Sequence, residues 1–197
     1  MQTETEAKFL RINHQVLRME LLKQGAVCNV PMRLMRRVIM DFPDGRLQKE
    51  SSFIRVREEG NKSTLTFKQF DAMTSIGGAK EIETMVGSFD EAIKIQQALG
   101  LVIKSVQESK RETWVLEDVE IVLDEWPWLE PYIEIEGPTE AEVKRTAMRL
   151  GLDWQTAIFG DATEAYRAQY PHMPEDANIA QIPSIKFGDP LPALLQP

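Results

Sequence analysis

The chain has 197 residues, of which 43% are hydrophobic and 27% charged, and this composition is typical of a soluble globular protein with a sizeable core. Its formal net charge of −8 argues against a general nucleic-acid binder or a membrane-surface protein, because either would be expected to present a basic face. The single cysteine, Cys28, excludes an internal disulfide, and the apolar runs are too short for a membrane span or a secretory signal, so we expect a cytoplasmic protein.

Alternating apolar and polar residues predict five strands in the first half of the chain, with two helices among them. The first helix begins after Asn13, whose side chain suits an N-cap, and ends before Gly25. The second begins after Ser88, with Glu91 placed to complete a capping box, and ends at Gly100. The strands are expected at residues 3–9, 36–42, 52–58, 63–69 and 80–86.

The second half continues the strand pattern and adds two helices. One helix follows Thr139, with Glu142 in a capping box, and the other spans residues 161–170. Residues 171–197 carry six of the eleven prolines, so we expect an extended tail without regular structure, which either covers the domain or has no functional part. The chain is thus divided into a domain at 1–170 and a tail at 171–197. The four further strands are expected at residues 101–106, 110–116, 119–125 and 132–136.

Charged residues share one face of the predicted strands, because side chains of a strand alternate between its two faces. A solvent-exposed sheet face would explain this for any single strand. Here i, i+2 pairs of like charges recur from strand to strand, and neighbouring carboxylates repel each other unless a cation lies between them. Mg²⁺ or Mn²⁺ would bind such carboxylates and bridge them to phosphates, which arginines and lysines hold. Closing the sheet into a barrel would turn this face into an interior channel and leave the outer apolar face to the helices.

The order of these charged residues resembles a known family. Residues Glu4-Thr5-Glu6-Ala7-Lys8 form an E-x-E-x-K motif, and the later charged residues follow in the order expected for the CYTH superfamily, the triphosphate tunnel metalloenzymes. The resemblance covers about residues 3 to 167. It implies an α+β fold, in which an eight-stranded antiparallel closed β-barrel forms a triphosphate tunnel with helices packed on its outside. The charged residues that follow the E-x-E-x-K motif in the family order are Arg55, Arg57, Lys68, Glu81, Glu83, Arg111, Asp124, Glu134 and Glu136.

The resemblance also implies a role for each charged residue. Metal would be bound by Glu4, Glu6 and Glu136, while Asp124 and Glu134 would bind a second metal or orient the attacking water. Phosphates would be held by Lys8, Arg55, Arg57, Lys68 and Arg111. Glu81 and Glu83 would complete the acidic wall. The catalytic residues would then be Glu4, Glu6, Lys8, Asp124, Glu134 and Glu136.

The sequence departs from the family pattern at three places. Ser109 stands where the family often has a lysine, and alternation puts the neighbouring Lys110 on the outer face. Lys80 stands where an arginine is common. The residues Trp126-Pro127-Trp128 replace glycines, and we expect them to pack a turn rather than to narrow the tunnel.

Three functions remain open at this point. We favour metal-dependent hydrolysis of a triphosphate, whether inorganic tripolyphosphate, thiamine triphosphate or a nucleoside triphosphate. The alternative is a class IV adenylyl cyclase that converts ATP to cyclic AMP and pyrophosphate, and the third is a non-catalytic module that binds polyphosphate or nucleotide. The expected cofactor is Mg²⁺ or Mn²⁺, the expected partner is a small-molecule triphosphate, and the chain is expected to be a monomer or homodimer.

Overall fold

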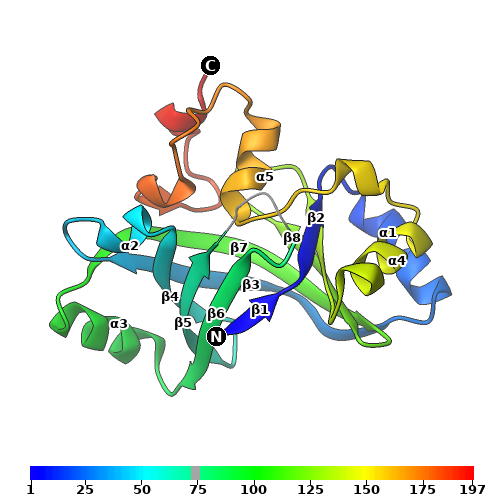
Figure 1. Cartoon of the computed structure of the whole chain (residues 1–197), viewed down its shortest axis with the longest axis horizontal. Coiled ribbons are helices and arrows are strands. Elements are labelled where there is room, and N and C mark those ends of the chain that lie inside the picture. The colour runs from blue at the N-terminus through cyan, green and yellow to red at the C-terminus, as the bar shows by residue number, and fades with distance from the viewer. Residues whose placement is uncertain (72–75) are drawn as a thin grey trace.

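The structure, a computed structural model, describes residues 1–71 and 76–197. One large sheet dominates it, and helices lie against the outside of that sheet (Figure 1). The strands are β1 (Gln2–Glu4), β2 (Glu6–Phe9), β3 (Val27–Asp41), β4 (Ser52–Glu58), β5 (Ser63–Phe70), β6 (Ala79–Val86), β7 (Val102–Leu116), β8 (Val119–Glu125), β9 (Tyr132–Glu136) and β10 (Ser184–Ile185).

Five α-helices and three short 3₁₀ helices accompany the sheet in the described part of the chain. Three of the longer α-helices begin at the predicted caps, because the side chains of Asn13, Ser88 and Thr139 accept hydrogen bonds from the backbone of the first turn. None of the helices described here combines the length and the apolar character needed to cross a membrane. The helices are α1 (His14–Lys23), α2 (Arg46–Lys49), α3 (Phe89–Ala98), α4 (Glu140–Arg149), η1 (Trp154–Thr156), α5 (Ala162–Gln169), η2 (Ile179–Gln181) and η3 (Ala193–Leu195).

The strand order is β1-β6-β5-β4-β3-β7-β8-β9-β2, with β10 added alongside β7. All neighbours are antiparallel except β10 and β7, which run parallel. The two strands at the ends of this order, β1 and β2, are separated in the sequence only by Thr5. One continuous segment at the N-terminus therefore forms both ends of the sheet.

The predicted combination of helices with an antiparallel sheet is confirmed, but the sheet differs from the expected eight-stranded closed barrel. It has ten strands, and within the described residues no hydrogen-bonded ladder joins β1 to β2. The predicted strand at 3–9 is interrupted at Thr5, and the predicted strands at 101–106 and 110–116 are one strand, β7. Residues 107–109, which lie between these two predicted strands, pair with β3 as well.

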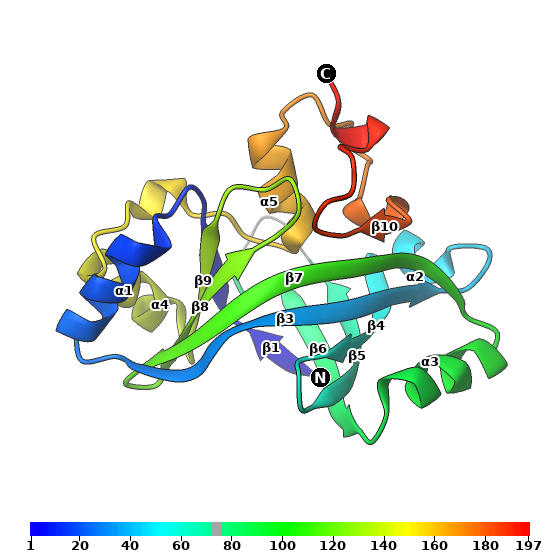
Figure 2. The same ribbon diagram turned by 180° about the vertical axis from the view of Figure 1, so that it is seen from behind.

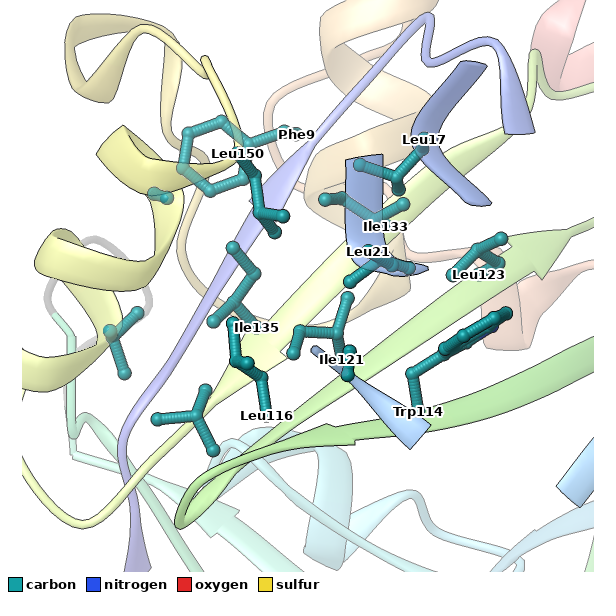
Figure 3. Close-up of a cluster of buried hydrophobic side chains, with 14 of the residues drawn as sticks. Phe9, Leu17, Leu21, Trp114, Leu116, Ile121, Leu123, Ile133, Ile135 and Leu150 are labelled. Atoms are coloured by element: carbon teal, nitrogen blue, oxygen red, sulfur yellow. The ribbon is translucent and has the colours of Figure 1, made fainter. Parts of the chain in front are cut away.

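Apolar residues on the outer face of the sheet are buried under helices. Helices α1 and α4 cover the strands around β9 (Figure 3), while α3 packs against β4 and β5. On β5 the polar side chains of Thr64, Thr66 and Lys68 are buried, whereas Leu65 and Phe67 are only half-buried. On this strand the charged face is thus at least as enclosed as the apolar one. The buried apolar cluster under α1 and α4 includes Phe9, Leu17, Leu21, Trp114, Leu116, Ile121, Leu123, Ile133, Ile135, Val143, Ala147 and Leu150.

The proline-rich segment 171–197 was predicted to lack regular structure, but it contains β10, η2 and η3 and packs against the sheet. Figure 2 shows it above β7, next to α5. The hydroxyl of Ser105 on β7 donates a hydrogen bond to the carbonyl of Ile182 at 2.6 Å. Prolines limit the backbone hydrogen bonds that this segment can form, and apolar contacts hold it against the sheet instead. The buried residues of this segment are Met173, Ala177, Ile179, Ile182, Ile185 and Leu195.

Candidate functional site

A charged cavity of ≈ 870 Å³ lies on the face of the sheet that the outer helices leave uncovered. Every predicted site residue except one lines it, so residues far apart in the sequence are brought together. The exception is Asp124, which is fully buried and bonded to Arg111. The predicted residues that line the cavity are Glu4, Glu6, Lys8, Arg55, Arg57, Lys68, Glu81, Glu83, Arg111, Glu134 and Glu136.

The basic wall of the cavity contains two cations that the sequence prediction did not single out, Arg33 and Arg37 on β3. The register of the sheet places Arg37 directly opposite Arg57, and Arg33 directly opposite Arg111. Like charges in such positions destabilise a sheet unless other groups compensate them. Burial and the nearby arginines lower the pKa of Arg37 to about 9 and that of Arg57 to about 10. This wall therefore carries an excess of positive charge.

Glu59, at the end of β4, compensates part of that wall. Its carboxylate lies 2.7 Å from Arg57 and 2.9 Å from Arg33. Burial disfavours the ionised carboxyl, but the charges of these arginines outweigh it and hold the pKa of Glu59 below its usual value. Glu83 on β6 lies 3.5 Å from Arg55 and accepts a hydrogen bond from Thr66 at 2.7 Å.

Arg111 is held in place by two acids. Its Nε donates to Asp124 at 2.8 Å, its Nη2 donates to the second oxygen of Asp124, and Nη2 also lies 2.7 Å from Glu134. Burial opposes the charge of Arg111, but these carboxylates raise its pKa well above the usual value. Because both oxygens of Asp124 accept hydrogen bonds from Arg111, Asp124 is placed to orient the arginine.

The acidic wall shows a row of like charges across three strands. Glu6 on β2 is opposite Glu136 on β9, which is opposite Glu120 on β8. Burial raises the pKa of Glu136 to about 7, and the carboxylates of Glu4, Glu6 and Glu120 add to the effect. On β6, which pairs with β1, burial and the nearby Glu4 raise the pKa of Glu81 to about 7 as well. This wall therefore carries an excess of negative charge, although Lys8 pairs with Glu6 and Lys68 with Glu4.

The donor set of the acidic row fits a divalent cation. Carboxylate oxygens are the ligands that Mg²⁺ and Mn²⁺ prefer, and a cation among Glu4, Glu6 and Glu136 would remove their repulsion. Among the residues that the structure describes, no three acidic, histidine or cysteine side chains converge closely enough to hold a metal ion as they stand. The carboxylates would therefore have to turn toward an ion as it binds.

Lys8 connects the two walls. It is almost fully buried, and its ammonium donates to Glu6 and to the carbonyl of Gly160, both at 2.7 Å. Glu134 lies 3.6 Å away. Burial opposes the charge, but Glu6 and Glu134 raise the pKa of Lys8 above its usual value. Burial likewise opposes the ionised form of Glu134, while Lys8 and Arg111 hold its pKa at about 2.

One end of the cavity is covered by the C-terminal segment. Ile179 and Ala180 of η2 line the cavity together with Trp126. The turn at Trp126-Pro127-Trp128 packs against α5, as expected, because the hydroxyl of Tyr166 donates a hydrogen bond to the carbonyl of Pro127 at 2.6 Å. Trp126 also lines the cavity. Other lining residues, such as Lys62, are exposed, and the cavity opens to solvent there.

The lining residues that the sequence prediction did not assign to the site include Arg33, Arg37, Glu59 and Glu120. For Arg37 the signal was present, because Val38 and Met40 mark the opposite, apolar face of the same strand. Glu120 likewise alternates with the outer residues Val119 and Ile121. Glu59 belongs to a hairpin, where alternation gives no guide.

Comparison with known proteins agrees with this arrangement. The family model of the CYTH domain matches residues 2–157. None of the curated proteins matches the chain at a significant level.

Several solved structures share the fold. An adenylate cyclase candidate from Vibrio parahaemolyticus has a TM-score of 0.73 and 14% identity, over 83% of this chain and 97% of its own. The PH1012 protein from Pyrococcus horikoshii OT3 has a TM-score of 0.64 and 22% identity, over 78% of this chain and 93% of its own. HpAC1 from Hippeastrum, an adenylyl cyclase candidate described as having a dominant triphosphatase activity, has a TM-score of 0.59 and 15% identity, over 89% of this chain and 99% of its own. At these identities the likeness establishes the fold alone.

Proposed function

The chain belongs to the CYTH domain family, and we propose that it hydrolyses a triphosphate in the charged cavity with the help of a divalent cation. The observation that carries this proposal is a pair of rows of like charge that neighbouring residues compensate only in part. Arg37 faces Arg57 across the basic wall, and Glu6 faces Glu136 across the acidic wall. A triphosphate supplies the charge that the first row lacks, and its cation supplies the charge that the second lacks. In this proposal residues 1–170 form the tunnel and residues 171–197 cover one of its ends.

The phosphate oxygens would be bound by Arg55, Arg57, Lys68 and Arg111. Guanidinium forks match pairs of phosphate oxygens, whereas a lysine acts as a point charge. Arg111 is already oriented by Asp124, so it would meet the phosphate without losing rotational freedom on binding. Glu83 and Glu81, at 3.5 and 3.9 Å from Arg55, keep that arginine directed into the cavity.

The metal ion, Mg²⁺ or Mn²⁺, would be held by Glu4, Glu6 and Glu136. When bound, it would neutralise charge on the transferred phosphoryl group and activate water. Glu134 would orient the attacking water, because its carboxylate is fixed between Arg111 and Lys8. Lys8 would hold the carboxylates of Glu6 and Glu134 in position and contribute positive charge toward the phosphates.

An adenylyl cyclase reaction is the second candidate, since the structural neighbours include proteins described as cyclase candidates. A cyclase must also hold a purine. Of the described residues that line the cavity, only Phe53 and Trp126 are aromatic, and Trp126 is covered by the guanidinium of Arg37 at 4.3 Å from the ring centroid. We therefore rank hydrolysis first.

One assay panel separates these candidates. The purified protein would be offered tripolyphosphate, thiamine triphosphate and ATP with Mg²⁺ or Mn²⁺, and both phosphate and cyclic AMP would be measured. We expect phosphate release, and we expect Glu6→Gln and Arg57→Ala to abolish it. Cyclic AMP from ATP, without phosphate from tripolyphosphate, would reverse the ranking. Tight binding of all three without turnover would favour a non-catalytic binding module.

A further inference from the structure

Arg37 on β3 is a buried cation without a carboxylate of its own. Only 5% of its surface is exposed. Asp124, the acid that acts on it, gives both carboxylate oxygens to Arg111. The one side chain that accepts a hydrogen bond from its guanidinium is the hydroxyl of Ser109, among the residues that the structure describes. A neutral hydroxyl leaves the charge uncompensated.

The charges around Arg37 make its burial still less favourable. Arg57 is its direct cross-strand neighbour, and Arg55 and Arg111 also act on it with the same sign of charge. A buried cation among like charges destabilises a free protein. An anion bound beside Arg37 would remove this electrostatic cost.

Two donors in this corner of the cavity have no acceptor within the described structure. They are Nε of Arg37 and Nε1 of Trp126, whose ring lies 4.3 Å from the guanidinium carbon. Both residues line the cavity. An arginine and an indole can only donate, so their natural partner carries several acceptor oxygens. A neutral purine would leave the charge unpaired.

The corner lies where the C-terminal segment covers the cavity. Arg37 is paired in the sheet with Gln107, and β10 runs beside β7 at Val106 and Gln107. Ile179 and Ala180 line the same cavity. Because residues of the C-terminal segment border the cavity at this corner, the group expected there is the end of a phosphate chain.

We propose that Arg37 and Trp126 form a subsite for the terminal phosphoryl group of the substrate, closed on its far side by residues 178–180 of the C-terminal segment. This assignment rests on the proposed function, since it concerns the same cavity. It gives the substrate a direction, with the terminal phosphate toward the C-terminal cover and any organic group toward the solvent-exposed opening near Lys62.

The test uses binding as well as turnover. Tripolyphosphate binding to the full chain would be measured by calorimetry, with and without Mg²⁺, for the wild type, Arg37→Met and Arg37→Lys. Methionine keeps much of the side-chain volume, and lysine keeps the charge without the fork. We expect Arg37→Met to weaken binding about 10- to 100-fold, as for the loss of a charged hydrogen-bonding group, and Arg37→Lys to be intermediate.

Arg36→Met is the matched control. Arg36 is the preceding residue on β3, but it is exposed, pairs with Glu58 and lies outside the cavity. We expect its tripolyphosphate affinity to equal that of the wild type. Unchanged affinity in Arg37→Met would overturn the proposal.

Thermal unfolding of the free protein distinguishes binding from a structural role. Removing an uncompensated buried charge should leave the melting temperature of Arg37→Met unchanged or higher, while the rise that tripolyphosphate produces in the wild type should be largely lost. A lower melting temperature with a full rise on adding tripolyphosphate would make Arg37 structural and refute the subsite. If the wild type binds tripolyphosphate through Arg37 but hydrolyses no triphosphate, the subsite stands and the proposed function fails.

Discussion

Asp124→Asn tests how Asp124 acts, and we expect it to destabilise the protein by about 3 kcal/mol, because removing one partner of a buried ion pair costs roughly 3–5 kcal/mol. Asp124 is fully buried, and both its oxygens accept hydrogen bonds from Arg111. Glu134 remains as a second partner of Arg111 at 2.7 Å, so the lower end of that range applies.

The assay is urea unfolding, with Glu125→Gln as the matched control. Glu125 is the next residue on β8, and it pairs with Lys110 at 3.5 Å on a partly exposed surface. Such exposed pairs contribute about 0–1 kcal/mol. A loss below about 1 kcal/mol in Asp124→Asn would refute the reasoning from burial.

The same variant separates two roles for Asp124. If the residue acts by orienting Arg111, Asp124→Asn should weaken tripolyphosphate binding and leave the affinity for Mg²⁺ alone unchanged. If it binds the metal, as the family resemblance implied, the affinity for Mg²⁺ should fall instead. Calorimetric titration of each ligand separately gives the answer.

Two further variants test the packing and the basic wall by chemical unfolding. Ile185→Ala removes a fully buried side chain of β10 and should cost about 2–5 kcal/mol, whereas Ile82→Ala, at an exposed position, should change little; equal losses would mean that the C-terminal segment is not packed as described. Glu59→Gln should destabilise at neutral pH, because Arg33 and Arg57 lose a shared partner. Since the pKa of Glu59 is lowered in the folded state from 4.5, the deficit should be full above that pH and shrink as the pH falls through the folded-state value. A deficit that is the same at every pH would contradict the ion-pair explanation.

Much of the fold could be predicted because local signals and global packing agree. The caps at Asn13, Ser88 and Thr139 start helices in the structure, and alternation placed the acids and bases of the short strands on one face. Where the prediction failed, tertiary pairing decided the outcome. Residues 27–35 of β3 contain Pro31 and have register shifts between Cys28 and Val30 and between Val30 and Arg33, so they do not alternate like an ordinary strand.

The candidate site was predicted where charges recur at i, i+2 or where the family resemblance supplied the residue, as for Lys68 and Arg111. Arg36 and Arg37 are adjacent, so one must face outward, and only the apolar neighbours Val38 and Met40 tell which. The opposition of Arg37 to Arg57, and of Glu6 to Glu136, depends on strand register. Register follows from which strands pair, and a single sequence does not fix that.

The most direct test of the charged cavity as a triphosphatase site is phosphate release from tripolyphosphate by the purified full chain. We expect release with Mg²⁺ or Mn²⁺, none after chelation with EDTA, and none from Glu6→Gln or Arg57→Ala under the same conditions, with Arg36→Met equal to the wild type. Release that continues in EDTA, or that persists in both cavity variants, would mean that the opposed acidic and basic walls are not where the reaction occurs.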